Sequence, residues 1–279
     1  MDHFAGFERI LRFHLHRTKV LRIYGPEDFI TRVEGKLSGY TWNLTGQYPL
    51  SILVTESGED VLKTAAFRAS SGFQREDLES VTWDGTLLDE PGFGVKAVVL
   101  DHGTPCLAFK VQQKMHVQIL SGELKRHGLV PGSWLSSLKS NVIIGDPPSK
   151  KIRIKTLDGI AESTLGELSC IYKIVPGAVL AYVVDAADST RNVDKIVALA
   201  ERADLLYIEA AFSIKDISLA VERKHLTAQK AGQIAREACV TRVKIIHLSP
   251  RYKGMESELL KEAAVAAGPG IRIEGGWKG

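Results

Sequence analysis

Strand-like and helix-like segments alternate through the second half of the chain, and this alternation constrains the fold more than any other feature. Apolar strand-like runs at 178–188, 204–212, 242–250 and 271–276 are separated by amphipathic helix-like runs at 192–203, 227–240 and 256–267. Strands that alternate with helices require a sheet covered by helices. We therefore predict a helix-covered sheet for this half.

The first half is richer in strands. Its predicted elements, in chain order, are a helix at 4–13, a strand at 20–25, a helix at 26–42 with proline in its first turn, and strands at 50–56, 64–70, 80–85, 94–102 and 105–111. The stretch 114–151 predicts a helix, a Gly-Pro-punctuated turn, a second short helix and a loop. The expected fold class is α/β, with two packed sheets and outer helices in a single domain over 1–279.

Composition excludes several classes of protein. Hydrophobic residues make up 44% of the 279 and charged residues 25%, which is ordinary for a globular protein. No apolar run approaches the ~20 residues that cross a bilayer, so no membrane partner is expected. The widely spaced cysteines Cys106, Cys170 and Cys239 predict buried free thiols in a reducing cytoplasm. The net charge of +3 permits a nucleic-acid partner without arguing for one.

Three apolar strands end in a side chain that can bind a metal ion. These are His102, Asp185 and His247, each at the point where the strand meets its loop. Ligands from distant segments converge at strand ends, and His with Asp suits Zn²⁺ or Mn²⁺. Each residue alone has another interpretation, His102 as a hydrogen-bonded core histidine and Asp185 as a turn cap. Together they favour a metal site.

The N-terminus carries further candidates. Asp2 and His3 form one acid–imidazole pair, and His14 and His16 form an H-x-H pair soon after. An H-x-H pair suits a strand, where alternate residues share a face. His14 and His16 instead lie at the end of a predicted helix, where a two-residue step points to different faces. We therefore expect His14 and His16 in a basic helix end, outside any metal site.

Six segments resemble, in the same order, the ribonuclease Z-like hydrolases of the metallo-β-lactamase fold. They read MDHFAGF…RTKVLRIYGP, LDHGTPCLAF, AYVVDAADSTRN, ADLLYIEAAF, HLTAQKAGQIAREA and IIHLSPRY. The resemblance covers essentially the whole chain and implies an αββα sandwich with a two-metal site at one edge. The family's first metal motif reads H-x-H-x-D-H, and this sequence begins at its last two residues. The resemblance therefore implies an N-terminally truncated member that lacks the first strands.

The resemblance also implies a set of metal ligands. Asp2, His3 and His247 would hold one ion, Asp185 would bridge, and His102 would hold the other. The ions would be Zn²⁺, or alternatively Mn²⁺ or Mg²⁺. Because the two front histidines are missing, the second ion would have fewer protein ligands than the three or four that zinc usually takes.

Catalytic roles are implied in the same way. An activated water would attack phosphorus with Asp2 as general base, and His225, oriented by Glu209, would protonate the leaving oxygen. The other interpretation makes His225 a helix-start residue and Glu209 a buried carboxylate that needs a partner. Arg251 would bind a substrate phosphate or form a loop salt bridge. The family pattern H-E-A-T reads I-E-A-A at 208–211, which weakens the assignment to tRNA specifically.

The stretch LKRHGLVPGSWLSSLK resembles the family's substrate arm, so an insertion is expected over 111–150. The basic residues in and beside it are Lys114, Lys125, Arg126, Lys139, Lys150, Lys151, Arg153 and Lys155. Phosphate binding by such a cluster would depend on salt, although Glu123 dilutes the charge.

The leading hypothesis is a cytoplasmic, homodimeric metal-dependent endoribonuclease that processes the 3′ ends of precursor tRNA. Two alternatives stay open. One is a hydrolase of the same fold that acts on a small phosphodiester or ester, and the other is a degenerate member that only binds.

Overall fold

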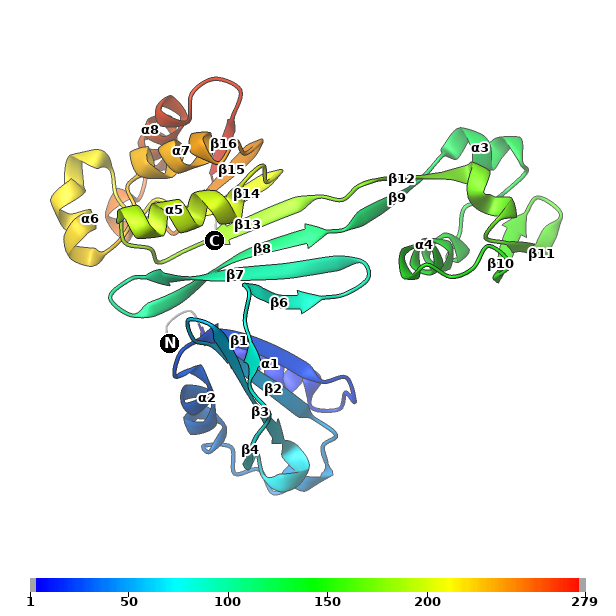
Figure 1. The fold of residues 1–279 in the computed structure, drawn as a ribbon, viewed down its shortest axis with the longest axis horizontal. Coiled ribbons are helices and arrows are strands. Elements are labelled where there is room, and N and C mark those ends of the chain that lie inside the picture. Colours follow the sequence, from blue (N-terminus) through cyan, green and yellow to red (C-terminus); the bar gives the residue numbers. More distant parts are fainter. Residues whose placement is uncertain (1–3, 276–279) are drawn as a thin grey trace.

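The structure is a computed structural model, and it describes residues 4–275. Two sheets carry helices against them, and a long arm projects from one end of the body (Figure 1). Asp2 and His3 lie outside the described residues.

The first sheet has the strand order β1-β2-β3-β4, with β5 pairing to β3. Its strands are β1 (Leu21–Pro26), β2 (Ser51–Ser57), β3 (Val61–Arg68), β4 (Arg75–Asp77) and β5 (Val81–Thr82), and its helices are α1 (Phe7–His14) and α2 (Phe29–Leu37). Alternate residues of β2 and β3, among them Ile52, Val54 and Phe67, are buried in one cluster with Leu11 of α1 and Val33 of α2. This alternation gives the sheet one apolar face, which the two helices cover.

The second sheet has the order β16-β15-β14-β13-β8-β7-β6. Its strands are β6 (Thr86–Asp89), β7 (Phe93–Asp101), β8 (Pro105–Gln113), β13 (Val179–Val183), β14 (Leu205–Glu209), β15 (Arg242–Ile246) and β16 (Arg272–Gly275). Strands β13 to β16 run parallel to one another, whereas β6, β7, β8 and β13 pair antiparallel.

The helices of the second sheet are α5 (Thr190–Ala200), α6 (Ile217–Arg223), α7 (Ala228–Glu237) and α8 (Glu256–Ala267). Two of them begin at a polar cap: the Ser189 hydroxyl accepts from the Asn192 N–H, and the Thr227 hydroxyl accepts from the Lys230 N–H. Their apolar stripes and the strands share one large buried core. Parallel strands linked by these helices therefore have their carboxyl ends at one edge.

The two sheets meet through a small apolar cluster. Leu62 of the first sheet packs there with Trp83 and with Ala97 of β7, and Val99 and Phe109 lie against them. The predicted αββα arrangement of two sheets with outer helices is confirmed.

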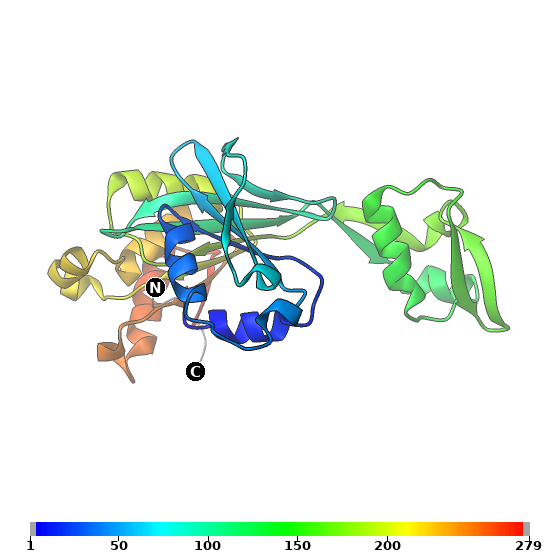
Figure 2. The same ribbon diagram turned by 90° about the horizontal axis from the view of Figure 1, so that it is seen from below.

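The arm begins with an antiparallel ribbon of β9 (Met115–Ile119) and β12 (Tyr172–Pro176). Its tip holds α3 (Ser121–Arg126), α4 (Trp134–Ile144), the hairpin β10 (Lys151–Thr156) and β11 (Gly159–Thr164), and a 3₁₀ segment, Glu167–Ile171. Figure 2 shows this tip well away from the two sheets, and it has its own apolar core around Trp134, Leu138 and Ile171. The expected insertion at 111–150 covers only the first part of this arm.

Three local predictions differ from the structure. The helix expected from Lys114 onward is wrong over Met115–Ile119, which forms a strand because it pairs with β12. The hairpin β10–β11 was not predicted. The three cysteines are free, but only Cys106 is partly buried. Cys170, in the 3₁₀ segment Glu167–Ile171, and Cys239, in the turn after α7, are exposed. No helix within residues 4–275 combines the length and apolar character that a membrane span requires.

Candidate metal centre

Three parallel strands bring acidic and imidazole side chains to one edge of the second sheet. Glu209 is the last residue of β14, Asp185 lies two residues beyond β13, and His247 directly follows β15. His225 joins them from the loop between α6 and α7. One ligand-type atom from each of these four residues lies within 4.8 Å of the others. We call them the strand-end cluster.

Glu209 connects the strand-end cluster. Its Oε2 lies 2.7 Å from His225 Nδ1 and 3.5 Å from His247 Nδ1. The other His247 nitrogen, Nε2, lies 3.5 Å from Asp185 Oδ1. The two carboxylates and two imidazoles therefore contact one another directly, although they are spread over 63 positions of the sequence, from Asp185 to His247.

The Glu209 carboxylate is fully buried. Burial alone would raise its pKa, but hydrogen bonds from His225 and His247 outweigh burial and hold the pKa of Glu209 below its ordinary value. Its Oε1 accepts the backbone N–H of Ala186 at 2.7 Å and of Leu226 at 3.4 Å. Glu209 is thus an ionised carboxylate whose two oxygens are both occupied. The sequence analysis expected that a buried carboxylate at this position would need a partner, and His225 is that partner.

Three residues at this edge have a strained backbone. Asp185, Lys224 and His247 all adopt the left-handed conformation, with φ of 56°, 58° and 55°. This conformation costs about 1–3 kcal/mol for a residue other than glycine, and such strain is typical of functional sites. The surrounding sheet and helices therefore hold these three residues in a backbone conformation that they would rarely adopt in an unfolded chain.

His102 lies at the same edge, in the turn between β7 and β8. Its ring centroid is 4.5 Å from that of His225, which in turn is 5.3 Å from that of His247. The His102 Nδ1–H donates to the Lys224 carbonyl at 2.7 Å, so Nε2 is the ring nitrogen left for another partner. His102 thus stands beside the strand-end cluster without belonging to its four members.

Cys106 supports the site in a way that sequence reasoning missed. Its Sγ donates to the Asp185 carbonyl at 2.6 Å. Burial, together with the nearby carboxylates of Asp185 and Glu209, raises the pKa of the Cys106 thiol to about 12. The thiol stays protonated at neutral pH, and its hydrogen bond holds the backbone carbonyl of Asp185 in place. The only sequence signal was its position in the same segment as His102.

Two other sets of candidates lie outside this group. Arg251 forms an ion pair with Asp216 at 3.4 Å, the salt bridge that was one of its two interpretations. His14 bonds the Ile10 carbonyl at the end of α1, and the His16 ring stacks edge-on near Tyr48. His14 and His16 are therefore separate from the strand-end cluster, as expected.

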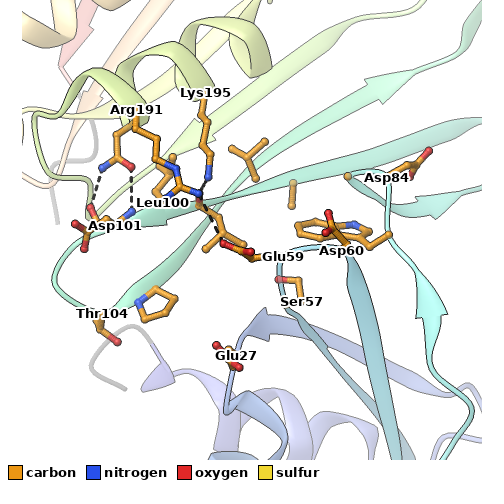
Figure 3. A pocket seen from close by; sticks show the side chains of 18 of the residues that line it. Glu27, Ser57, Glu59, Asp60, Asp84, Leu100, Asp101, Thr104, Arg191 and Lys195 are labelled. Carbon is orange, nitrogen blue, oxygen red and sulfur yellow. Dashed lines mark hydrogen bonds and ion pairs between the residues drawn. The ribbon is translucent and has the colours of Figure 1, made fainter.

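A cavity of about 690 Å³ opens between the two sheets, and Figure 3 shows part of its lining. Arg191 of α5 reaches Glu59 there at 3.8 Å. Lys195 donates to the Val99 carbonyl at 2.7 Å, beside the part of β7 that β6 leaves uncovered. Asp101 and Gly103 line the cavity, but the strand-end cluster does not. The cavity and the candidate metal centre are thus distinct.

Comparison with known proteins adds to this geometry. A ribonuclease Z from Deinococcus radiodurans is 27% identical over 284 aligned positions, covering 99% of this chain and 81% of the relative. One from Thermobifida fusca is 30% identical, covering 78% of this chain and 63% of the relative. The crystal structure of the metallo-β-lactamase fold protein YhfI from Bacillus subtilis aligns with a TM-score of 0.50 at 17% identity, covering 98% of this chain and 70% of that one. No family model matches the chain.

The αββα arrangement and the likeness to YhfI together define a protein of the metallo-β-lactamase fold. Within that class, both of the sequence relatives described above carry the same name, ribonuclease Z. The chain is similar over most of its length to proteins of the ribonuclease Z family.

The donors of the strand-end cluster fit a divalent metal ion. Imidazole nitrogens and carboxylate oxygens are the ligands that zinc takes in proteins, and they also suit manganese. Asp185 and His247 are partly exposed, so their donor atoms are accessible at the edge. This donor set is consistent with the divalent metal binding of the family.

Proposed function

We propose that the chain is a metal-dependent endoribonuclease that cleaves precursor tRNA at its 3′ end. The observation that carries this proposal is the strand-end cluster, in which the buried Glu209 holds His225 beside Asp185 and His247. The similarity to proteins named ribonuclease Z supports the substrate class.

Metal binding is assigned to Asp185, His247 and His102, with Asp2 and His3 as further ligands outside the described residues. The proposed ion is Zn²⁺, with Mn²⁺ or Mg²⁺ as alternatives. When bound, such an ion supplies Lewis-acid chemistry and lowers the pKa of a water molecule. Asp2 is assigned the role of general base.

His225 is assigned the proton that the leaving oxygen needs. Its Nδ1–H donates to Glu209 Oε2, so the proton for transfer is carried on Nε2. Both Glu209 oxygens are already occupied by hydrogen bonds, which favours a positioning role for Glu209 over metal binding. Glu209 also stabilises the protonated imidazole through its negative charge.

A second candidate function is the hydrolysis of a small phosphodiester. It is favoured by the I-E-A-A sequence, because Ile208 and Ala211 put buried apolar groups where the family pattern has histidine and threonine.

One experiment tests both candidates. The chain is incubated with Zn²⁺ or Mn²⁺ and either a precursor tRNA or bis(p-nitrophenyl) phosphate. Two variants are assayed beside it: His247→Ala, and the control His16→Ala, whose residue lies in the turn between α1 and β1. We expect trailer release by the wild type and His16→Ala, and its loss in His247→Ala. Turnover of the small phosphodiester alone would favour the second candidate. Absence of cleavage and of bound metal would leave a protein that only binds.

We also propose a cytoplasmic homodimer. Three free cysteines support a reducing compartment. The arm tip lies well away from the two sheets of its own chain (Figure 2), so an arm from a second copy could supply substrate contacts. Light scattering should give twice the 30.6 kDa chain mass, and a monomer would contradict the proposal.

A further inference from the structure

Lys224 occupies a position where a lysine is disfavoured. It ends helix α6 in the left-handed conformation, with φ of 58°. The His225 N–H bonds the Ala220 carbonyl at 2.9 Å, which closes the helix in the manner that usually places glycine at this point. A lysine side chain here has a conformational cost, so the side chain itself calls for an explanation.

The backbone and the side chain of Lys224 both contact the turn that carries His102. Its carbonyl accepts the Nδ1–H of His102 at 2.7 Å. Its side chain lies across Gly103, with Nζ 3.0 Å and Cδ 3.1 Å from the place a Cβ atom would take on Gly103. Gly103 thus leaves the room that the lysine stem fills, and the ammonium group is set over the turn that carries His102.

Two other cations near this edge are paired. Lys230 pairs with Asp188 at 3.3 Å, and Arg251 pairs with Asp216 at 3.4 Å. Within residues 4–275, Lys224 has no ion-pair partner, and it is exposed. Its charge is therefore available to an incoming anion.

We propose that the Lys224 ammonium binds a non-bridging phosphate oxygen of the substrate at the His102 side of the centre. The proposal rests on the proposed function and deepens it, because it selects anionic phosphodiesters over neutral esters. An ammonium is a compact point charge with three donors, well suited to phosphate.

The backbone allows an unusually clean variant. Lys224→Gly removes the side chain but favours the left-handed conformation, so the carbonyl that orients His102 is kept. Arg202→Gly is the matched control, since Arg202 is also exposed and left-handed, with φ of 53°, at the end of α5. Lys224→Arg retains the charge.

The first measurement is binding of a short single-stranded RNA across a series of salt concentrations. Removing one phosphate contact should reduce the slope of log K against log salt by about 0.7. We expect this reduction in Lys224→Gly, the wild-type slope in Arg202→Gly, and a slope near that of the wild type in Lys224→Arg. An unchanged slope in Lys224→Gly, or no RNA binding by the wild type, overturns the proposal.

The second measurement compares two substrates of the metal-loaded chain. Lys224→Gly should raise KM for bis(p-nitrophenyl) phosphate by about tenfold, the effect of one charged hydrogen bond, and leave p-nitrophenyl acetate unaffected. Metal content equal to the wild type shows that His102 is undisturbed. If the wild type cleaves, and Lys224→Gly has the same KM and the same salt dependence of RNA binding, then the role of Lys224 is overturned and the proposed function is not. A reduced slope without any cleavage overturns the proposed function alone.

Discussion

The strand-end cluster and the arm differ in how the chain forms them: the cluster joins distant segments, whereas the arm is one continuous segment. The cluster gathers side chains from the ends of β13, β14 and β15 and the loop before α7, over a core that spans most of the second sheet. The arm tip is one continuous segment with a small core of its own, joined to the body by the ribbon β9–β12. The chemistry thus depends on distant segments and the arm on local ones. Substitutions in one region should leave the other intact.

The largest effect is expected at the cluster. His225→Ala should reduce kcat on a phosphodiester by about 10²–10⁴-fold, because it removes the proposed proton donor. The midpoint of chemical unfolding should also fall, because the His225 side chain is only 16% exposed and its loss leaves the buried Glu209 carboxylate without its 2.7 Å partner. The control is His116→Ala on β9 of the arm, which should keep the wild-type kcat. Equal losses in both variants would show that the two regions are not separable.

The next effect belongs to the arm. Leu138 of α4 is fully buried in the arm core, and Leu138→Ala should destabilise this core by about 2–5 kcal/mol. Amide hydrogen exchange should then increase within Ser121–Ile171 and stay unchanged in β13 to β15. Leu157→Ala is the matched control, because that side chain is 80% exposed. Faster exchange throughout the second sheet would contradict an independent arm.

A smaller effect is expected for Glu209→Gln. The variant keeps the acceptor for the Ala186 N–H but loses the charge that faces His225 and His247, so activity or metal affinity should fall about 10–100-fold. Retention of wild-type metal affinity and activity would argue against the positioning role.

The same variant predicts a pH dependence for the metal-free chain. The pKa of Glu209 is lower in the folded chain than its ordinary value of 4.5, so ionised Glu209 stabilises the fold above that pH. This contribution is lost as pH falls through the lowered folded pKa. Urea unfolding should show a stability gap between wild type and Glu209→Gln that is full near pH 6 and narrows below pH 4.5. A gap that widens in acid would mean that the pKa is raised.

The same contrast explains what the sequence could predict. That His102, Asp185 and His247 lie at one edge could be predicted, because each follows an apolar run and the carboxyl ends of parallel strands share an edge. Their role as metal ligands stays a prediction. The strand Met115–Ile119 could not be predicted, since its pairing with β12 joins positions more than 50 residues apart. The left-handed backbone of Asp185 and His247 was equally hidden, because it is imposed by packing and leaves no glycine in the sequence.

Labelling of the cysteines tests directly whether the strand-end cluster is less accessible than the arm, and its expected effect is the smallest of those considered. Cys106 donates a hydrogen bond to the Asp185 carbonyl, and burial raises the pKa of its thiol to about 12. The thiol therefore stays protonated at pH 8, whereas thiolate is the reactive form. Cys170 on the arm and Cys239 after α7 are exposed. A thiol reagent at pH 8 should therefore label two cysteines in the folded chain and all three in denaturant. Cys106→Ser should leave the folded count at two, while Cys170→Ser should reduce it to one. Rapid labelling of Cys106 in the folded wild type would mean that the cluster opens as readily as the arm, and the distinction between the two regions would fail.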